Sequence, residues 1–316
     1  MRQTTDLFAK ASDNATPTGA VAGTLEANDG LRLRYGLFRP IGRPLRGTVI
    51  LLQGRNECIE KYFETINDLS AAGYGVAAMD WRGQGGSERM LKDPEKGHID
   101  DFHTYAADLD LFLHQVVLPD CRPPYYVVGH STGSLIALLA SPRLSNQVER
   151  MVLVAPLLAF GGNPAAARRL VLATRVLTAL GLGALTLRKK PLIPKPFAGN
   201  VLTSDKDRFQ RNMNLWEANP GLFVGTATMA WLNAASRAMD EVADPDYMRQ
   251  LRIPTLIIAA GADAVVSTPA IEHYGRRMRS GSVLTIDGAR HEILQEADIY
   301  REPLLAAALA FFKMAD

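Results

Sequence analysis

The chain has 316 residues, of which 47% are hydrophobic and 22% are charged, and its formal net charge is +2. A chain of this size holds one large domain with an insertion, or two modest domains. The nearly balanced charge argues against nucleic acid as a partner. Two cysteines, Cys58 and Cys121, are too few for a disulfide framework and have no metal-ligand spacing. We therefore expect two buried or partly buried thiols and no metal site.

Residues 1–20 are polar and mixed in charge, and we expect a loose or helical leader there. This segment lacks the apolar core of a signal peptide. Nowhere does the sequence show the run of about 18 uncharged apolar residues that predicts a membrane-spanning helix. We therefore expect a cytoplasmic protein, and we leave open a peripheral contact with the inner face of the membrane.

Short apolar segments alternate with helical patterns along most of the chain. The segment 31–38 alternates apolar and polar residues, which predicts a half-buried strand at a sheet edge. Buried strands are expected at 47–52, 75–80, 125–129, 148–155, 254–261 and 281–286. Helices are expected at 60–72, 102–117, 134–140 and 303–314. This alternation predicts βαβ units and an α/β fold with a mostly parallel, doubly wound sheet.

The alternation stops between Pro156 and about Pro245. Helical patterns replace it at 165–187, 205–218 and 221–239, with a proline-rich connector at 191–196. We interpret residues 157–245 as a helical cap inserted over the active site. The core is then formed by the segments 21–156 and 246–316.

The first cap helix carries a mixture of apolar and basic residues. Its basic residues are Arg168, Arg169 and Arg175, and the cluster 188–190 follows it. This pattern is typical either of ordinary cap packing, with basic residues near a helix C-terminus, or of a helix seated on an anionic membrane surface. Apolar residues that face the active site would suit an acyl chain.

The pentapeptide 129–133, Gly-His-Ser-Thr-Gly, lies between an expected strand and an expected helix. A G-x-S-x-G sequence in that context is typical of a nucleophile elbow, a sharp turn that exposes a serine at the end of a sheet. Gly129 and Gly133 allow the strand and the helix to approach closely. The motif predicts that Ser131 is a catalytic nucleophile.

A base and an acid for this serine are expected in later strand-to-helix loops, in the order serine, acid, histidine. Asp263 and His291 follow two later strands in that order. His291 would accept the serine proton, and Asp263 would orient the imidazole. His130 and His273 are rival bases, Asp287 and Glu292 are rival acids, and three histidines precede the serine: His98, His103 and His114.

An oxyanion hole needs two backbone N–H donors. The amide of Thr132, directly after the nucleophile, is one candidate. The second is the amide of Arg55 in the loop after the strand 47–52, where Gly54 permits a close approach. The glycine-rich loop 80–87 does not match a phosphate-binding motif, so we interpret it as a structural loop beside the elbow.

In these segments, namely 53–57, 80–87, 129–133, 261–263 and 290–292, the chain resembles the α/β-hydrolase fold. Within it the chain is similar to bacterial lysophospholipases and monoacylglycerol lipase-like serine hydrolases, and the segment 200–205 resembles the bacterial lysophospholipase branch. Gln53 stands where many relatives have histidine. The resemblance implies hydrolysis of lipid esters, of a lysophospholipid or monoacylglycerol type, through an acyl-enzyme and without a metal or organic cofactor.

Other functions remain open from the sequence alone. A small-ester carboxylesterase would use the same site. A peptidase that releases N-terminal residues would need acidic cap residues to hold the substrate amine, and the nearest cluster is Asp240, Glu241 and Asp244. A non-catalytic binding protein would not need all three residues Ser131, Asp263 and His291. The oligomeric state is not predicted.

Overall fold

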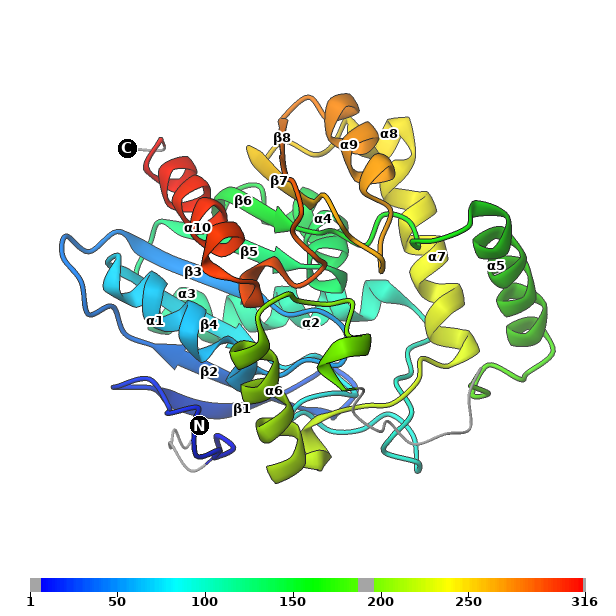
Figure 1. Ribbon diagram of the computed structural model, residues 1–316, viewed down its shortest axis with the longest axis horizontal. Coiled ribbons are helices and arrows are strands. Elements are labelled where there is room, and N and C mark those ends of the chain that lie inside the picture. The colour runs from blue at the N-terminus through cyan, green and yellow to red at the C-terminus, as the bar shows by residue number, and fades with distance from the viewer. Residues whose placement is uncertain (1–6, 187–195, 315–316) are drawn as a thin grey trace.

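The computed structural model describes residues 7–186 and 196–314. Eight strands form one sheet in the order β1, β2, β4, β3, β5, β6, β7, β8 (Figure 1). Their bounds are Val21–Glu26, Arg32–Phe38, Gly47–Leu52 (β3), Tyr74–Met79 (β4), Tyr125–His130, Val148–Val154, Thr255–Ala260 and Gly281–Ile286. β2 pairs antiparallel with β1 and β4, and all other neighbouring strands pair parallel. The predicted parallel α/β sheet is confirmed.

Helices connect the parallel strands and cover both faces of the sheet. They are α1 Phe63–Ala71, α2 Phe102–Phe112, α3 Leu118–Asp120, α4 Thr132–Leu144, α5 Pro164–Ala179, α6 Lys206–Ala218, α7 Met229–Ala243, α8 Pro245–Met248, α9 Thr268–Arg277 and α10 Asp298–Lys313. A π-helical turn, Leu113–Val117, continues α2, and short 3₁₀ turns occupy Ile59–Tyr62, Phe197–Gly199, Pro220–Leu222 and Ile293–Gln295.

Successive residues of the central strands point to opposite faces of the sheet, and both faces are buried. On β3, Ile50 and Leu52 belong to the apolar core beneath α2, α4 and α9, whereas Val49 and Leu51 belong to the core beneath α1 and α10. This explains why the central strands are continuous apolar runs. It also places the carboxyl ends of the parallel strands, and the loops that follow them, at one edge of the sheet.

The predictions for the N-terminal part need correction. The segment 31–38 was expected at the sheet edge, but β2 lies second in the sheet and β1 forms the edge. Residues 7–20 contain no helix, and Phe8 is buried against Phe38 and Phe63, with ring centroids 5.6 and 5.7 Å away. The described part of the expected leader is therefore packed on the core, because one aromatic side chain fills a gap between β2 and α1.

The segment predicted as a cap contains α5, α6 and α7. The third helix begins at Met229 rather than at residue 221. A 3₁₀ turn, Pro220–Leu222, and a non-helical stretch precede it, and the Thr228 amide donates to the Gly97 carbonyl at 2.9 Å. α7 packs on the core helices α2 and α4, whereas α5 packs on α7 and stands at the margin of the molecule (Figure 1). The basic cluster 188–190 and most of the connector 191–196 lie outside the described residues.

Candidate active site

Ser131 sits between β5 and α4 with backbone dihedral angles of φ 51° and ψ −111°. A side chain at positive φ is strained, and such strain is common where a nucleophile is held in an exposed turn. The flanking positions must be glycine because a Cβ atom there would clash with neighbouring backbone atoms. A Cβ on Gly133 would lie 2.3 Å from the Leu52 carbonyl oxygen, and a Cβ on Gly129 would lie 2.9 Å from the Ser134 Cα. The turn thus brings the start of α4 against the end of β3.

The structure brings Ser131, His291 and Asp263 together. His291 Nε2 lies 3.0 Å from Ser131 Oγ, and its Nδ1 lies 2.7 Å from Asp263 Oδ2. Burial raises the pKa of Asp263, but the hydrogen bond and charge of His291 outweigh it, so the net pKa is below 3.8. An ionised carboxylate only accepts, so Nδ1 carries the proton and Nε2 is free to accept from the serine hydroxyl. This is the arrangement that general-base activation of a serine requires.

The loop after β3 leaves one amide free beside the elbow. The Gly54 amide donates to Glu57 Oε2 at 2.5 Å, and the Asn56 amide donates to Gln84 Oε1 at 3.1 Å. Between them, the Arg55 amide has no acceptor among the described residues, and neither does the Thr132 amide at the start of α4. Arg55 and Thr132 both line the cavity that contains Ser131. The two amides are therefore available to a developing oxyanion.

The loop 80–87 is hydrogen-bonded to the loop that carries Arg55. Gln84 Nε2 donates to the Gly54 carbonyl at 2.8 Å, and Gln53 Nε2 donates to Asp80 Oδ1 at 3.0 Å. Asp80 is buried and forms an ion pair with Arg34 at 2.5 Å. The loop 80–87 thus hydrogen-bonds the Arg55 loop, and Gln53 donates into its ion cluster.

Sequence reasoning missed a buried cluster of charges directly beneath the site. Lys61 Nζ lies 2.7 Å from Glu57 Oε1 and 2.7 Å from Glu292 Oε1, and all three side chains are at most 10% exposed. Burial raises the pKa of Glu57, but the charges of Lys61 and His130 lower it well below 4.5 overall. Because Glu57 also accepts from Gly54 and from the Tyr62 hydroxyl, it fixes the path of the Arg55 loop.

His130, considered as a rival base, belongs to this cluster, and its ring nitrogens contact Glu57, Tyr62 and the His291 carbonyl rather than Ser131. Its Nε2 lies 3.2 Å from the His291 carbonyl oxygen and its Nδ1 lies 3.2 Å from Glu57 Oε2. Both partners are acceptors, which favours the doubly protonated ring. Burial lowers the pKa of His130, but the charge and hydrogen bond of Glu57 raise it by more than burial lowers it. The pKa of His130 is therefore above its usual value of 6.5. His130 thus holds the backbone of His291 in place.

The remaining rival residues are engaged by other groups or lie on the surface. Glu292 pairs with Lys61, while Asp287 and His273 are exposed on the surface. The three earlier histidines contact other groups: His98 contacts Thr228, His103 contacts Glu241 and His114 contacts Asp110. The acidic residues considered for binding an amine are also engaged. Asp240 pairs with Arg175, Glu241 with His103, and Asp244 caps α8. None of these three lines the cavity around Ser131.

A cavity of about 400 Å³ opens onto Ser131 and His291. Its apolar lining comes from loops of the core and from residues 202–232, and includes Leu157, Phe160, Leu202, Ala227, Trp231, Leu232 and Val265. A smaller apolar cavity of about 120 Å³ adjoins it through Asn56, Leu202 and Glu292 and is lined by Phe209, Met213, Leu215, Trp216 and Phe223. Both volumes are lined mainly by apolar side chains, as expected for a site that holds a hydrocarbon chain.

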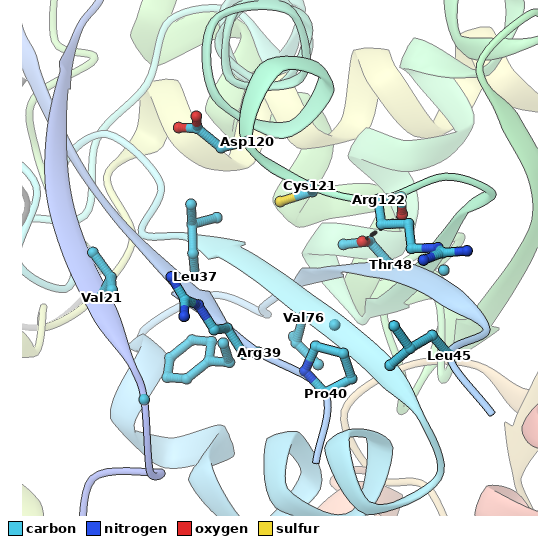
Figure 2. A pocket seen from close by; sticks show the side chains of 14 residues that line it. Val21, Leu37, Arg39, Pro40, Leu45, Thr48, Val76, Asp120, Cys121 and Arg122 are labelled. Atoms are coloured by element: carbon cyan, nitrogen blue, oxygen red, sulfur yellow. Dashed lines mark hydrogen bonds between the residues drawn. The ribbon is translucent and has the colours of Figure 1, made fainter. Parts of the chain in front are cut away.

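A third cavity, of about 360 Å³, lies at the amino-terminal ends of β3 and β4, away from Ser131 (Figure 2). Gly47 and Thr48 begin β3 there, and Cys121 and Arg122 line its other side. Cys58 is buried and Cys121 partly buried, as predicted. Over residues 7–186 and 196–314 no group of three or more histidine, cysteine or acidic side chains is placed to hold a metal ion.

The described helices include none with the length and apolar character needed to cross a membrane.

Comparison with known proteins places the chain in a family. The family model "Serine aminopeptidase, S33" matches residues 43–298. Lysophospholipase L2 of Escherichia coli K12 is 33% identical over 284 residues, covering 84% of this chain and 79% of that protein. Human monoglyceride lipase is 27% identical over 241 residues, covering 74% of this chain and 71% of that protein.

Solved structures share the fold at low sequence identity. A soluble variant of monoglyceride lipase from Saccharomyces cerevisiae superposes with a TM-score of 0.75 at 17% identity, covering 97% of this chain and 98% of that one. The monoacylglycerol lipase of Paleococcus ferrophilus superposes with a TM-score of 0.71 at 22% identity, covering 90% and 99%. The chain therefore belongs to the serine aminopeptidase S33 family and has the α/β-hydrolase fold.

Proposed function

We propose that this protein hydrolyses the carboxylic ester of a single-chain lipid, a lysophospholipid or a monoacylglycerol, through an acyl-enzyme. The hydrogen-bonded series Ser131, His291 and Asp263 at the floor of an apolar cavity carries the proposal. Lysophospholipase L2 and the monoglyceride lipases, to which the chain is similar, support a lipid substrate. The acidic residues Asp240, Glu241 and Asp244 lie outside the cavity, so the site offers little support for binding the amine of a peptide.

Each residue has a chemical role in this proposal. Ser131 Oγ attacks the ester carbonyl while His291 Nε2 takes its proton, and the amides of Arg55 and Thr132 stabilise the oxyanion. His291 then protonates the leaving alcohol, and the acyl group stays on Ser131. A water molecule, deprotonated by His291, attacks the acyl-enzyme and releases the fatty acid and the free serine. The ionised Asp263 stabilises the imidazolium in both steps.

The test is labelling with a fluorophosphonate probe together with hydrolysis of p-nitrophenyl butyrate. Wild-type protein is expected to be labelled, and Ser131→Ala to lose labelling and about 10⁴-fold or more of the activity. Ser134→Ala, one turn along α4, is the control and should keep the label. Equal labelling of Ser131→Ala would overturn the proposed nucleophile. A panel of lysophospholipid, monoacylglycerol, short p-nitrophenyl esters and aminoacyl amides then identifies the substrate, and preference for the amides would overturn the lipid assignment.

We also propose that α5 contacts an anionic membrane surface and brings the cavity to its lipid substrate. In α5 only Thr174 is buried, whereas Leu172, Val176 and Leu180 at its C-terminal end are 51–69% exposed. The helix carries three arginines and no acidic residue. An exposed apolar face with flanking positive charge is typical of helices that lie in a membrane interface.

Sedimentation with vesicles of phosphatidylglycerol and phosphatidylcholine tests this contact. The triple variant Leu172→Ser, Val176→Ser, Leu180→Ser is expected to bind about 10- to 100-fold more weakly because it removes most of the exposed apolar face. Ile299→Ser, which removes an exposed apolar side chain from α10, is the control and should bind as wild type. Equal binding by the triple variant would overturn the membrane proposal and leave the ester chemistry untouched.

A further inference from the structure

Arg55 carries a positive charge beside the active site that no carboxylate neutralises. Its Nη2 donates to the Gly225 carbonyl oxygen, and its guanidinium carbon lies 5.5 Å from the centroid of the Trp231 ring. The Nε–H is buried and has no acceptor. Among the described residues no Asp or Glu oxygen lies within 4.0 Å of a guanidinium nitrogen of Arg55. Burial lowers the pKa of Arg55 to about 10, so the side chain is still a cation at neutral pH.

Arg55 is partly buried, and the arginines that are buried more deeply, Arg34, Arg82 and Arg301, each pair with a carboxylate. Arg34 forms ion pairs with Glu60 and Asp80, and Arg82 forms them with Asp29 and Asp108. Removing a charge from water without a counter-charge is costly, which is why buried charges are normally paired. The unpaired state of Arg55 is therefore a feature to explain, and a ligand that brings its own negative charge explains it.

The cavity has no spare negative charge for Arg55. Of the residues that line it, the acidic ones are Glu57 and Glu292, and both are engaged by Lys61 at 2.7 Å. Arg55 is thus the residue lining the cavity around Ser131 whose positive charge has no carboxylate partner among the described residues. Guanidinium groups bind phosphate oxygens through paired hydrogen bonds, and a dry, low-dielectric setting strengthens such a contact.

We propose that the Arg55 side chain binds the phosphodiester of a lysophospholipid substrate and so selects it over a neutral monoacylglycerol. This inference rests on the proposed ester hydrolysis at Ser131. The amide of Arg55 faces the reacting carbonyl in that proposal, so its side chain begins at the ester. In a lysophospholipid only the glycerol unit separates the ester from the phosphate. One residue then contacts both ends of that unit, the carbonyl through its amide and the phosphate through its guanidinium.

A purely structural role is the competing explanation, because Arg55 ties the Gly225 segment to the core. Arg89 provides a matched control. It also has no carboxylate partner among the described residues, and its Nη2 donates to the Gly221 carbonyl of the same segment. Unlike Arg55, Arg89 does not line the cavity around Ser131. A loss caused by loosening this segment should therefore appear in both variants, whereas a loss of phosphate binding should appear in Arg55 variants alone.

The experiment measures kcat/KM for lauroyl lysophosphatidylglycerol and for 1-lauroylglycerol, both as monomers, and compares their ratio. Arg55→Met is expected to lower the ratio of phospholipid to glycerol ester by about 10- to 100-fold, the effect of losing a charge-assisted hydrogen bond. Arg55→Lys keeps the positive charge but loses the paired N–H donors of the guanidinium, so its ratio should lie between those of wild type and Arg55→Met. Arg89→Met should leave the ratio unchanged. An unchanged ratio in Arg55→Met, or an equal fall in Arg89→Met, overturns the proposal.

A second measurement does not depend on lipid turnover. Dodecyl phosphate, laurate and dodecanol are tested as inhibitors of p-nitrophenyl butyrate hydrolysis. The inhibition constant of dodecyl phosphate should rise at least 10-fold in Arg55→Met, with a smaller change for laurate and none for dodecanol. A rise for laurate alone would mean that Arg55 binds the released acid, and it overturns the head-group assignment. If wild type cleaves the butyrate but no lipid, the lipid function fails while this assay still decides the role of Arg55.

Discussion

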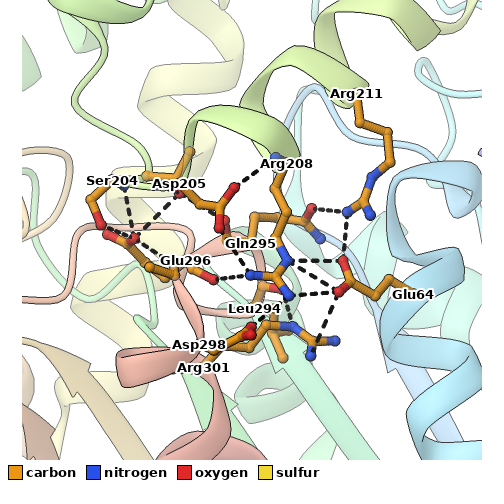
Figure 3. Close-up of polar contacts among 12 residues, drawn as sticks. Glu64, Ser204, Asp205, Arg208, Arg211, Leu294, Gln295, Glu296, Asp298 and Arg301 are labelled. Atoms are coloured by element: carbon orange, nitrogen blue, oxygen red, sulfur yellow. Dashed lines mark hydrogen bonds and ion pairs between the residues drawn. The ribbon is translucent and has the colours of Figure 1, made fainter. Parts of the chain in front are cut away.

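Two helices of the segment 157–245, α5 and α6, are attached to the rest of the molecule in different ways. α6 is tied down by charge: Arg208 contacts Glu64 on α1 and Asp298 on α10, each at 2.7 Å, and Arg211 contacts Glu64 at 2.8 Å (Figure 3). Among the described residues α5 forms one ion pair, between Arg175 and Asp240, and both of these side chains are at least half exposed. α5 otherwise packs on α7, which itself rests on the core.

The difference matters because α6 is attached to the loop that carries His291. The Glu292 amide donates to the Leu202 carbonyl at 2.8 Å, and Thr203 Oγ1 donates to the Gln295 carbonyl at 2.7 Å. Glu296 in turn accepts from the Ser204 amide at 2.8 Å. Residues 202–204 and α6 therefore help to fix the proposed base, whereas α5 packs on α7 and presents an exposed surface. We infer that α6 is fixed in place to support the chemistry and that α5 is exposed to make contacts outside the molecule.

The largest expected effect comes from cutting the α6 attachment. Arg208→Met removes a guanidinium that bonds Glu64, Asp205, Asp298 and the Glu296 carbonyl. Glu64 loses its main partner, and we expect the free energy of unfolding to fall by about 1–3 kcal/mol. Urea denaturation followed by circular dichroism measures this. Arg237→Met, which breaks an exposed pair with Asp101, is the control and should cost less than about 0.5 kcal/mol.

The same variant also tests the link to the triad. If α6 fixes the His291 loop, Arg208→Met should lower kcat for p-nitrophenyl butyrate several-fold at a temperature where the protein is fully folded. A loss of stability with wild-type kcat would break the link between α6 and the chemistry, although the difference in attachment would remain.

The next effect depends on pH. Burial raises the pKa of Glu64, but its hydrogen bond to Arg208 and the charges of Arg301 and Arg211 lower it from 4.5 to about 2. Because the folded pKa is the lower one, Glu64 stabilises the fold fully above pH 4.5, and this contribution is lost as the pH falls toward 2. After allowance for solvent screening, we expect about 1–2 kcal/mol.

Unfolding measured between pH 2 and pH 7 checks the sign. Glu64→Gln should be less stable than wild type at pH 7 and should approach it near pH 2. Glu302→Gln, an exposed position on α10, is the control and should follow the wild-type curve throughout. A constant gap between Glu64→Gln and wild type at all pH values would show that packing, and not the carboxylate charge, holds α6 in place.

The parts of the molecule that depend on local sequence patterns were predictable from the sequence. The buried strands are continuous apolar runs, so their positions were predictable, and β8 lies at the predicted residues. α6 was predictable from Asp205, whose side chain accepts from the Arg208 amide as an N-cap. The order of Ser131, Asp263 and His291 after three strands predicted that they would meet, because the carboxyl ends of parallel strands share one edge.

Features that depend on distant partners were not predictable. Lys61 and Glu292 are 231 positions apart, and the sequence around either residue alone predicts an exposed charged side chain. β1 was not predicted, because Gly23 interrupts its strand pattern. The start of α7 was misplaced because the amides of Gly225 and Thr228 donate to the carbonyls of Glu95 and Gly97 instead of continuing a helix. In each case tertiary contacts override the local pattern.

The smallest effect is expected at α5. Arg175→Met breaks the pair with Asp240, and since both side chains are mostly in solvent the free energy of unfolding should change by less than about 0.5 kcal/mol. Binding to anionic vesicles should still weaken about five-fold, since one basic residue near such a surface contributes about 1 kcal/mol. A loss of more than 1 kcal/mol in stability would mean that α5 is held by charge as α6 is. Unchanged stability with weaker vesicle binding would locate the function of α5 in what it contacts outside the molecule.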